Sequence, residues 1–177
     1  MEAREKPGSL RIGTPGNGTV AQLALDFLRR LAGAEFVHVP FRGGTPAALE
    51  TIAGRIEATV AGLGELGAND RLRLLALAAP ERLARWPAVP TFREQGVDFV
   101  GAAWFGLSAP AGLPEPIADR LAAECAALVA QLETATLIEG LGSTPNRGLS
   151  RAAVAAFVAA EAARWGEAAR AAGVRAE

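Results

Sequence analysis

The 177-residue sequence has no tyrosine, one cysteine and one histidine, and these absences exclude several kinds of site. Cys125 has no partner for a disulfide within the chain, and it falls on the apolar face of a predicted helix, where packing is its expected role. His38 is the sole histidine and no cysteine cluster exists, so we expect neither a metal site nor a cofactor.

The sequence also lacks an excess of charge of one sign and long apolar runs. The formal net charge is −1 and the basic residues form no stripe, which, with the lack of tyrosine, argues against a nucleic-acid partner. Met1–Gly8 is polar and contains no apolar core of a signal peptide. No run approaches the roughly 18 apolar residues of a membrane span. We therefore expect a soluble chain, cytoplasmic if it is complete as written.

Half of the residues are hydrophobic, which suffices for a core, and the order of the predicted elements is that of an α/β fold. Ser9–Ile12 is typical of a buried strand, and Thr19 stands at an N-cap position before a helical pattern that stops at Gly33. Glu35–Phe41 is rich in β-branched and aromatic residues and predicts a second strand. The inward positions of the first helix are Val20, Leu23, Ala24, Phe27, Leu28 and Leu31.

A second glycine-rich turn and helix follow the second strand. Thr45 is predicted to cap a helix over Ala47–Ala53, with Pro46 at its first position. Arg55–Val60 then predicts a third strand. Two successive units of strand, glycine loop and helix are typical of a parallel sheet.

The chain changes character near residue 109. Before it, Leu72–Ala78 and Phe99–Ser108 predict two more strands, and Thr91–Gln95 predicts a short helix. Ala109–Pro116 carries three prolines, and beyond it the pattern is almost entirely helical, with Ser150 capping the last helix. The apolar positions of these helices need a partner surface; they are Leu121, Leu128, Leu132, Val154, Phe157 and Trp165.

The first glycine-rich loop is the leading candidate for a binding site. A strand end, a glycine loop and a helix N-terminus together offer free N–H groups and the positive end of a helix dipole to a carboxylate or phosphate. The predicted donors are the hydroxyls of Thr14 and Thr19 and the N–H groups of Gly18–Val20. The alternative is an ordinary turn in which Thr19 only caps the helix. The residues assigned to this loop are Thr14, Gly16, Asn17, Gly18 and Thr19.

The second candidate is the turn formed by Arg42, Gly43, Gly44 and Thr45. Its glycines permit close approach of the backbone to a ligand, and Thr45 opens a helix. Arg42 is either a cation for a ligand carboxylate or an exposed residue at the rim. His38, inside the preceding strand, is favoured as a structural histidine.

Segments from about Ser9 to Arg175 carry a family resemblance. They read GTPGNGTVAQLALDFLRRLAG, VHVPFRGGTPAALETIAGRIEATVAG, LRLLALAAPERLARWPAVPTFREQGV and AAWFGLSAPAGLPEPIADRLAAE. In this order they resemble the substrate-binding proteins of tripartite tricarboxylate transporters, the Bug-type extracytoplasmic receptors. The segments VPTFREQG, WFGLSAPAG and VHVPFRGG are together the most specific.

This resemblance implies a two-lobed receptor like the periplasmic binding proteins of type II, the Venus flytraps. Residues 9–102 would form the second-lobe α/β ligand-binding domain, with a parallel-rich sheet flanked by helices. Residues 103–177 would be the mostly helical return to an incomplete first lobe, whose own ligand loop would be missing. Such a receptor is periplasmic, captures a small carboxylate and passes it to a membrane permease.

The sequence departs from the family after the third predicted strand. Family members commonly have an acidic residue and an asparagine there, followed by a helix containing proline, whereas Ala61–Glu65 reads AGLGE. The departure puts one polar ligand contact and the shape of the cleft in question.

The leading hypothesis is a binding protein for a small organic carboxylate, such as a di- or tricarboxylate, an amino acid or an aromatic acid. It is not an enzyme, because no Ser–His–Asp order, G-x-S-x-G elbow, P-loop lysine or paired carboxylate site is present. A phosphate-handling enzyme is accordingly the weakest alternative. The stronger alternative is a truncated receptor remnant that forms a homo-oligomer through its uncovered apolar surface.

Overall fold

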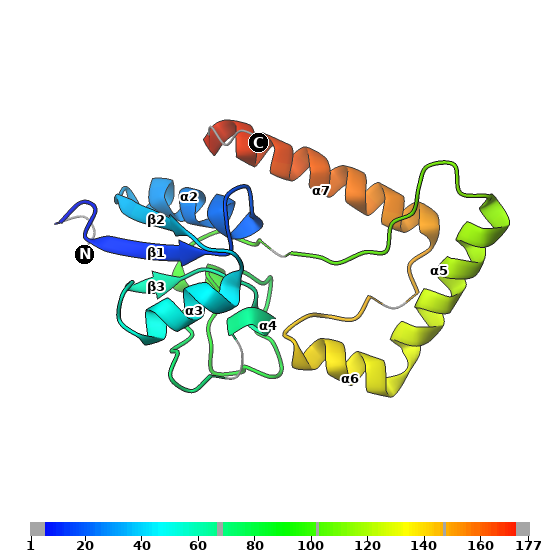
Figure 1. The fold of residues 1–177 in the computed structure, drawn as a ribbon, viewed down its shortest axis with the longest axis horizontal. Helices are drawn as coiled ribbons and strands as arrows, with labels where there is room; N and C mark the ends of the chain where they lie inside the picture. Colours follow the sequence, from blue (N-terminus) through cyan, green and yellow to red (C-terminus); the bar gives the residue numbers. More distant parts are fainter. Residues whose placement is uncertain (1–5, 67–68, 102, 147, 173–177) are drawn as a thin grey trace. The chain divides into compact units, whose positions relative to one another are not determined.

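The computed structural model describes residues 6–66, 69–101, 103–146 and 148–172. The chain divides into two compact units. The sheet unit contains the chain up to Ala103 and the segment from Glu167 onward, and the helical unit is Trp104–Gly166. Figure 1 shows a parallel sheet with its helices in the sheet unit, and helices joined by extended connections in the described part of the helical unit.

Three parallel strands form the sheet. β1 (Leu10–Thr14) lies between β2 (Phe36–Pro40) and the short β3 (Ala58–Thr59), so the strand order is β2-β1-β3. α2 (Val20–Ala32) connects β1 to β2, and α3 (Gly44–Ile52) connects β2 to β3. Right-handed connections of this kind place α2 and α3 on opposite faces of the sheet. The predicted α/β fold with a parallel sheet flanked by helices is confirmed.

Helix α2 begins and ends at the predicted residues. The Thr19 side chain accepts a hydrogen bond from the Gln22 N–H group, and Gly33 ends the helix in the left-handed conformation with φ of 56°. Leu23, Ala24 and Leu25 are buried, whereas Leu31, predicted to face inward, is exposed.

Three predicted strands differ from the structure: Arg55–Val60 is reduced to the two residues of β3, and two later runs do not form strands. Within Leu72–Ala78, only Leu77 pairs, in an isolated parallel bridge with Thr91, and Leu75 is exposed rather than covered on both faces. Phe99–Ser108 forms no strand among its described residues. Phe99 is buried instead through its ring, whose centroid lies 4.9 Å from that of Phe27 and 5.8 Å from that of Phe92. Leu77 and Phe99 thus reach the core from runs with little or no backbone pairing.

The short helix predicted after Thr91 is a single 3₁₀ turn, η1 (Arg93–Gln95). Thr91 and Glu94 form a reciprocal capping box: the Thr91 N–H group donates to Glu94 Oε2 at 2.7 Å, and the Glu94 N–H group donates to Thr91 Oγ1 at 3.2 Å. Thr91 is buried, so the residue that starts this turn is also part of the core.

The helical unit contains α5 (Glu115–Ala130), α6 (Leu132–Gly140) and most of α7 (Arg151–Ala172). Ser150 caps α7 as predicted, because its Oγ accepts from the Ala153 N–H group at 3.2 Å. The Arg151 guanidinium joins α7 to α5 through Glu115 at 2.6 Å and Asp119 at 2.5 Å.

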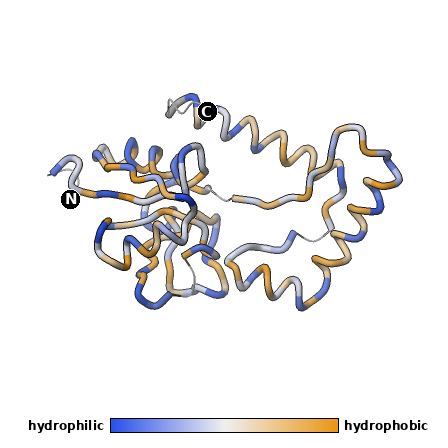
Figure 2. Tube along the Cα trace, in the orientation of Figure 1, coloured by the Kyte–Doolittle hydropathy of each residue, from blue (hydrophilic) through white to orange (hydrophobic). Residues whose placement is uncertain are grey.

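Apolar positions recur along all three helices (Figure 2), yet Ala135 alone is buried among the described residues of the helical unit. Exposed large apolar side chains of the helical unit include Ile117, Leu121, Leu128, Leu132, Leu137, Val154 and Phe157. No single helix of the described chain is long and apolar enough to cross a membrane; α5 and α6 pass that test only as a pair bent by 77° at their junction.

Candidate ligand-binding site

Three loops meet at one edge of the sheet, where the parallel strands end. The loop after β1 and the loop after β2 are joined directly, because the Phe41 N–H group donates to the Thr14 carbonyl oxygen and the Gly43 N–H group donates to that of Pro15, both at 2.9 Å. The chain order reverses about β1, with β2 on one side and β3 on the other. In open α/β sheets, ligands bind outside the carboxyl ends of the strands at such a reversal.

The loop after β1 depends on a close backbone approach at Gly16. Its φ is 148°, and a Cβ atom there would lie 3.3 Å from the Phe41 carbonyl oxygen. A side chain at this position would therefore push the first two loops apart. The close neighbour of Gly16 is thus the second loop of the same chain.

At the N-terminus of α2, two of the predicted donors already have internal partners. The Thr19 hydroxyl donates to the Gly16 carbonyl oxygen at 2.9 Å while it caps α2, and the Gly18 N–H group donates to Gln22 Oε1 at 2.7 Å. The structure records no acceptor within its described residues for the N–H groups of Val20 and Ala21. These two groups are the free donors at the positive end of the α2 dipole.

Thr14 lies beneath the loop. It is completely buried, and its hydroxyl oxygen is 2.6 Å from His38 Nε2 on the neighbouring strand. Burial lowers the pKa of His38, against a smaller opposing effect of Asp26. A neutral His38 and Thr14 therefore anchor the base of the loop, which supports a structural role for the histidine. The predicted ligand contact of Thr14 remains untested.

The second loop leads into α3 earlier than predicted. Gly43 is the N-cap and α3 starts at Gly44. Because the N-cap residue is glycine, it makes no side-chain hydrogen bond to the first turn of the helix. The prediction that Thr45 caps this helix is wrong: Thr45 is its second residue, and its hydroxyl donates to the Glu65 carbonyl oxygen at 3.4 Å. The glycines let the helical backbone begin two residues before the position that Pro46 suggests.

A carboxylate of the chain itself occupies the N-terminus of α3. Glu65, in the short helix α4 (Leu63–Leu66) after β3, accepts a hydrogen bond from the Gly44 N–H group at 2.7 Å and from the Gly62 N–H group at 3.3 Å. Sequence reasoning missed this contact because residues 44 and 65 are far apart along the chain. The only signal was the unusual AGLGE segment, which contains Glu65.

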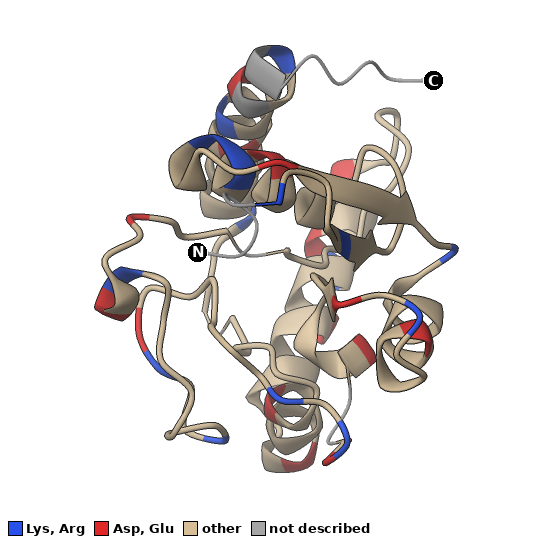
Figure 3. Ribbon diagram, turned by 90° about the vertical axis from the view of Figure 1, so that its left-hand side faces the viewer, with Lys and Arg blue, Asp and Glu red and all other residues tan. Residues whose placement is uncertain are grey.

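The remaining assigned side chains, Asn17 and Arg42, are exposed. Arg42 makes no hydrogen bond or ion pair with any residue that the structure describes. Figure 3 shows basic and acidic positions interspersed along the described chain rather than gathered into a run of one sign. Arg42 is therefore a local positive charge beside the second loop, free to meet an anion.

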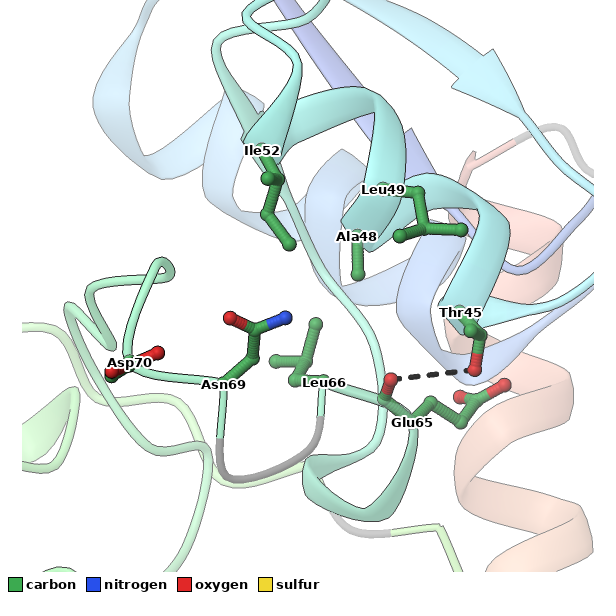
Figure 4. A pocket seen from close by; sticks show the side chains of 8 residues that line it. All are labelled: Thr45, Ala48, Leu49, Ile52, Glu65, Leu66, Asn69 and Asp70. Atoms are coloured by element: carbon green, nitrogen blue, oxygen red, sulfur yellow. Dashed lines mark hydrogen bonds between the residues drawn. The ribbon is translucent and has the colours of Figure 1, made fainter.

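Beside α3 lies an open depression of about 460 Å³ (Figure 4). It is lined by α3 on one side and by Glu65, Leu66, Asn69 and Asp70 on the other. The lining residues are Thr45, Ala48, Leu49, Ile52, Glu65, Leu66, Asn69 and Asp70. Glu65 and Thr45 thus belong both to this depression and to the start of α3.

A parallel α/β sheet with glycine loops at its carboxyl edge is the architecture of one lobe of a periplasmic binding protein. The chain belongs to the family described as tripartite tricarboxylate transporter family receptor, whose model matches residues 1–174. This confirms the family that the sequence segments indicated.

Three similar proteins define the relationship further. The UPF0065 protein in the tcbD-tcbE intergenic region of Pseudomonas sp. (strain P51) is 32% identical over 168 residues, which are 92% of this chain and 50% of that protein. The structure of R. palustris Rpa4515 with adipate is 28% identical, with a TM-score of 0.90 over 98% of this chain and 59% of that one. MatC from Rhodopseudomonas palustris with bound malate is 29% identical, with a TM-score of 0.80 over 91% of this chain and 57% of that one. The chain thus spans half to three fifths of the length of these relatives.

Proposed function

We propose that this chain acts as a solute-binding receptor for a small organic carboxylate and serves a tripartite tricarboxylate transporter in the periplasm. The family supports this class of function, and the adipate and malate in the two similar structures support a carboxylate. The observation that carries the proposal is the pair of free N–H groups of Val20 and Ala21 at the carboxyl edge of the parallel sheet.

The proposed site binds without covalent chemistry. A ligand carboxylate accepts hydrogen bonds from the first N–H groups of α2, where the helix dipole favours negative charge. Arg42 adds a cation from the adjoining loop. The other assigned residues shape the loops and supply polar contacts: Thr14, Gly16, Asn17, Gly18, Thr19, Gly43, Gly44 and Thr45.

The domain assignment forms part of the same proposal. Residues 9–102 act as the ligand-binding second lobe, and residues 103–177 complete a first lobe. Closure of the two lobes buries the ligand and excludes water, and the closed form is what a membrane permease recognises.

Thermal unfolding in the presence of di- and tricarboxylates, amino acids and aromatic acids tests this function. A ligand that binds only the native state increases the free energy of unfolding, by about 2.7 kcal/mol at 100 times the dissociation constant. The melting temperature therefore rises with ligand concentration. A carboxylate that raises the midpoint, with its uncharged amide analogue inactive, supports the receptor. A cooperative transition that no acid in the panel moves contradicts it.

An oligomerising interaction module is the second candidate, and the exposed apolar helices of the helical unit favour it. Leu132 is 80% exposed and Phe105 93% exposed, so apolar area is available to a second copy of the chain. Light scattering coupled to size-exclusion chromatography distinguishes the candidates. A stable dimer that binds no carboxylate supports the module, and a monomer that binds one excludes it.

A further inference from the structure

Helix α5 has two apolar rows of residues that differ in how far they are covered. One row is half-buried and carries mostly small side chains, namely Ala118, Ala122, Cys125 and Val129. The larger apolar side chains lie on another face of the helix and are between 40% and 52% exposed; they are Ile117, Leu121 and Leu128. The helix therefore turns its larger apolar side chains towards solvent.

The exposed face has the spacing of a helix–helix interface. Ile117, Leu121, Glu124 and Leu128, together termed the α5 face, follow one another at intervals of four, three and four residues. This alternation places residues along the seam between two packed helices. Because α5 has 16 residues, a length at which an isolated helix is only marginally stable, a second surface that covers this face would stabilise it.

The chain exposes enough surface for such a contact. Its accessible surface is 11714 Å². Two compact bodies with the sizes of its two units would together expose only about 9,700 Å², by the usual scaling of surface with mass. Any contact between the units lowers the total, so the excess of roughly 2,000 Å² belongs to the units themselves. Each partner in a stable interface of standard size buries about 800 Å².

The charges on α5 indicate what covers this face. Glu124 lies within the apolar row, and its carboxylate is 3.8 Å from the guanidinium of Arg120, one turn earlier. Both side chains remain exposed, by 66% and 82% respectively. A wholly apolar partner would take water from Glu124 without offering a cation in return, which is unfavourable. The surface that fits must therefore be apolar and also carry a positive charge near its centre.

A second α5 helix that runs in the opposite direction has these properties. It places Ile117 of each copy opposite Leu128 of the other, because these residues end the row on either side. Glu124 then meets Leu121 of the second copy, with Arg120 of that copy beside it. Two parallel helices would instead bring the two Glu124 carboxylates together, where like charges repel. The charges thus favour the antiparallel arrangement.

We propose that the α5 face is an interface with a second copy of the chain, in which two α5 helices pack antiparallel about a two-fold axis. Arg120 of each copy pairs with Glu124 of the other, and this pair fixes the register. The inference rests on the second candidate function, oligomerisation, and gives it a surface and an orientation. It does not require that the chain bind a carboxylate.

Reversal of the two charges tests the interface by sedimentation equilibrium over a series of protein concentrations. Arg120→Glu and Glu124→Arg should each weaken dimerisation about tenfold or more, because each creates two like-charge contacts about the two-fold axis. The double variant Arg120→Glu/Glu124→Arg places opposite charges together again and should dimerise within about threefold of the unchanged chain. This recovery also excludes misfolding as the cause of the single effects.

The matched control is another exposed ion pair, formed in the sheet unit by Arg93 and Asp98 at 2.8 Å. Arg93→Glu and Asp98→Arg change the net charge equally and should alter dimerisation by less than about twofold. A dimer that none of the α5 variants weakens overturns this interface but leaves the oligomerising module intact. A chain that stays monomeric at every concentration overturns both.

Disulfide trapping tests the orientation in a chain that carries Cys125→Ser. Antiparallel packing brings residue 117 of one copy to residue 128 of the other. A mixture of Ile117→Cys and Leu128→Cys should therefore form a disulfide-linked heterodimer under mild oxidation, whereas neither variant should crosslink with itself. Crosslinking of each variant with itself, and not in the mixture, overturns the antiparallel arrangement.

Discussion

In the sheet unit, β1, α2 and α3 each contribute buried apolar side chains, whereas in the helical unit most large apolar side chains of α5, α6 and α7 remain exposed. Leu25 in α2 is 2% exposed, and Leu132 in α6 is 80% exposed. Both leucines lie in well-formed helices. The contrast teaches that helix formation and core formation are separate matters: a helix needs a second apolar surface to gain stability from its leucines.

The same substitution in both units tests this contrast with the largest expected effect. Leu25→Ala should lower the free energy of unfolding by about 2–5 kcal/mol, because it removes buried methyl groups and leaves a cavity. Leu132→Ala should change it by less than about 0.5 kcal/mol. Urea denaturation followed by circular dichroism measures both. A large effect of Leu132→Ala that grows with protein concentration would show that a second copy covers this helix.

A glycine in each unit gives the next comparison. Gly44→Ala should destabilise the chain by about 1–3 kcal/mol, the usual range for overpacking, because its Cβ atom would lie 2.6 Å from Glu65 Oε2 and 2.7 Å from Ala61 Cβ. Gly112→Ala in the helical unit meets open space and should be neutral within about 0.5 kcal/mol. Chemical denaturation compares the two. Equal effects would mean that Glu65 moves aside without loss.

The helix caps provide a smaller effect. Thr19→Ala removes the hydroxyl that caps α2 and should lower the free energy of unfolding by about 1 kcal/mol. Ser150→Ala removes the corresponding cap of α7, but that helix begins in the unit without a buried core. Its loss should appear as faster amide exchange in the first turn of α7, with an unchanged global midpoint. A shift of the global midpoint by Ser150→Ala would show that the two units unfold together.

The smallest effects are expected from one ion pair in each unit, and they are measured by how the stability changes as the pH falls into the acid range. The Arg11 side chain and N–H group donate to Glu57 and lower the pKa of that carboxyl from 4.5 to about 2. A depressed pKa in the folded state stabilises the fold above the unfolded pKa, and this is lost as the pH falls from about 4.5 towards about 2. Glu57→Gln should therefore flatten the fall in the urea midpoint across this window.

Glu115 in the helical unit is the control for that titration. Arg151 lowers the pKa of Glu115 by hydrogen bonding, but the contact joins two exposed helices. Glu115→Gln should leave the acid dependence of the sheet unit's midpoint unchanged. An equal flattening by both variants would show that the two units unfold together as one cooperative unit.

Much of the sheet unit was predictable because its signals are local. Thr19 and Gly33 delimit α2, and the β-branched and aromatic run ending near Phe41 marks β2. The strand predictions at Leu72–Ala78 and Phe99–Ser108 failed because an apolar run indicates that some of its residues are buried and does not indicate that its backbone pairs with another strand. Leu77 and Phe99 are indeed buried, one in a single bridge and the other in a ring stack.

The candidate site was predictable as a position but not as a set of hydrogen bonds. The glycine loops mark the carboxyl edge of the sheet, which any parallel α/β arrangement brings together. Which donors stay free there depends on the side chains of Gln22, His38 and Glu65, which meet two N–H groups and the hydroxyl of Thr14. The Gln22 contact is local, but no spacing in the sequence encodes the contacts of His38 and Glu65, which lie 24 and 21 residues from their partners.

The sequence by itself determined the boundaries of α2, the order of the elements from β1 to β3, the location of the glycine loops and the family. The structural features follow from interactions between residues close together in the chain, and the family follows from the order of its characteristic sequence segments. Only the tertiary structure decided that Glu65 sits at the start of α3, that Thr14 is buried against His38, and that the leucines of the helical unit lack cover. Those outcomes depend on contacts between residues distant in the chain, whose formation is set by packing in three dimensions and not by local propensity.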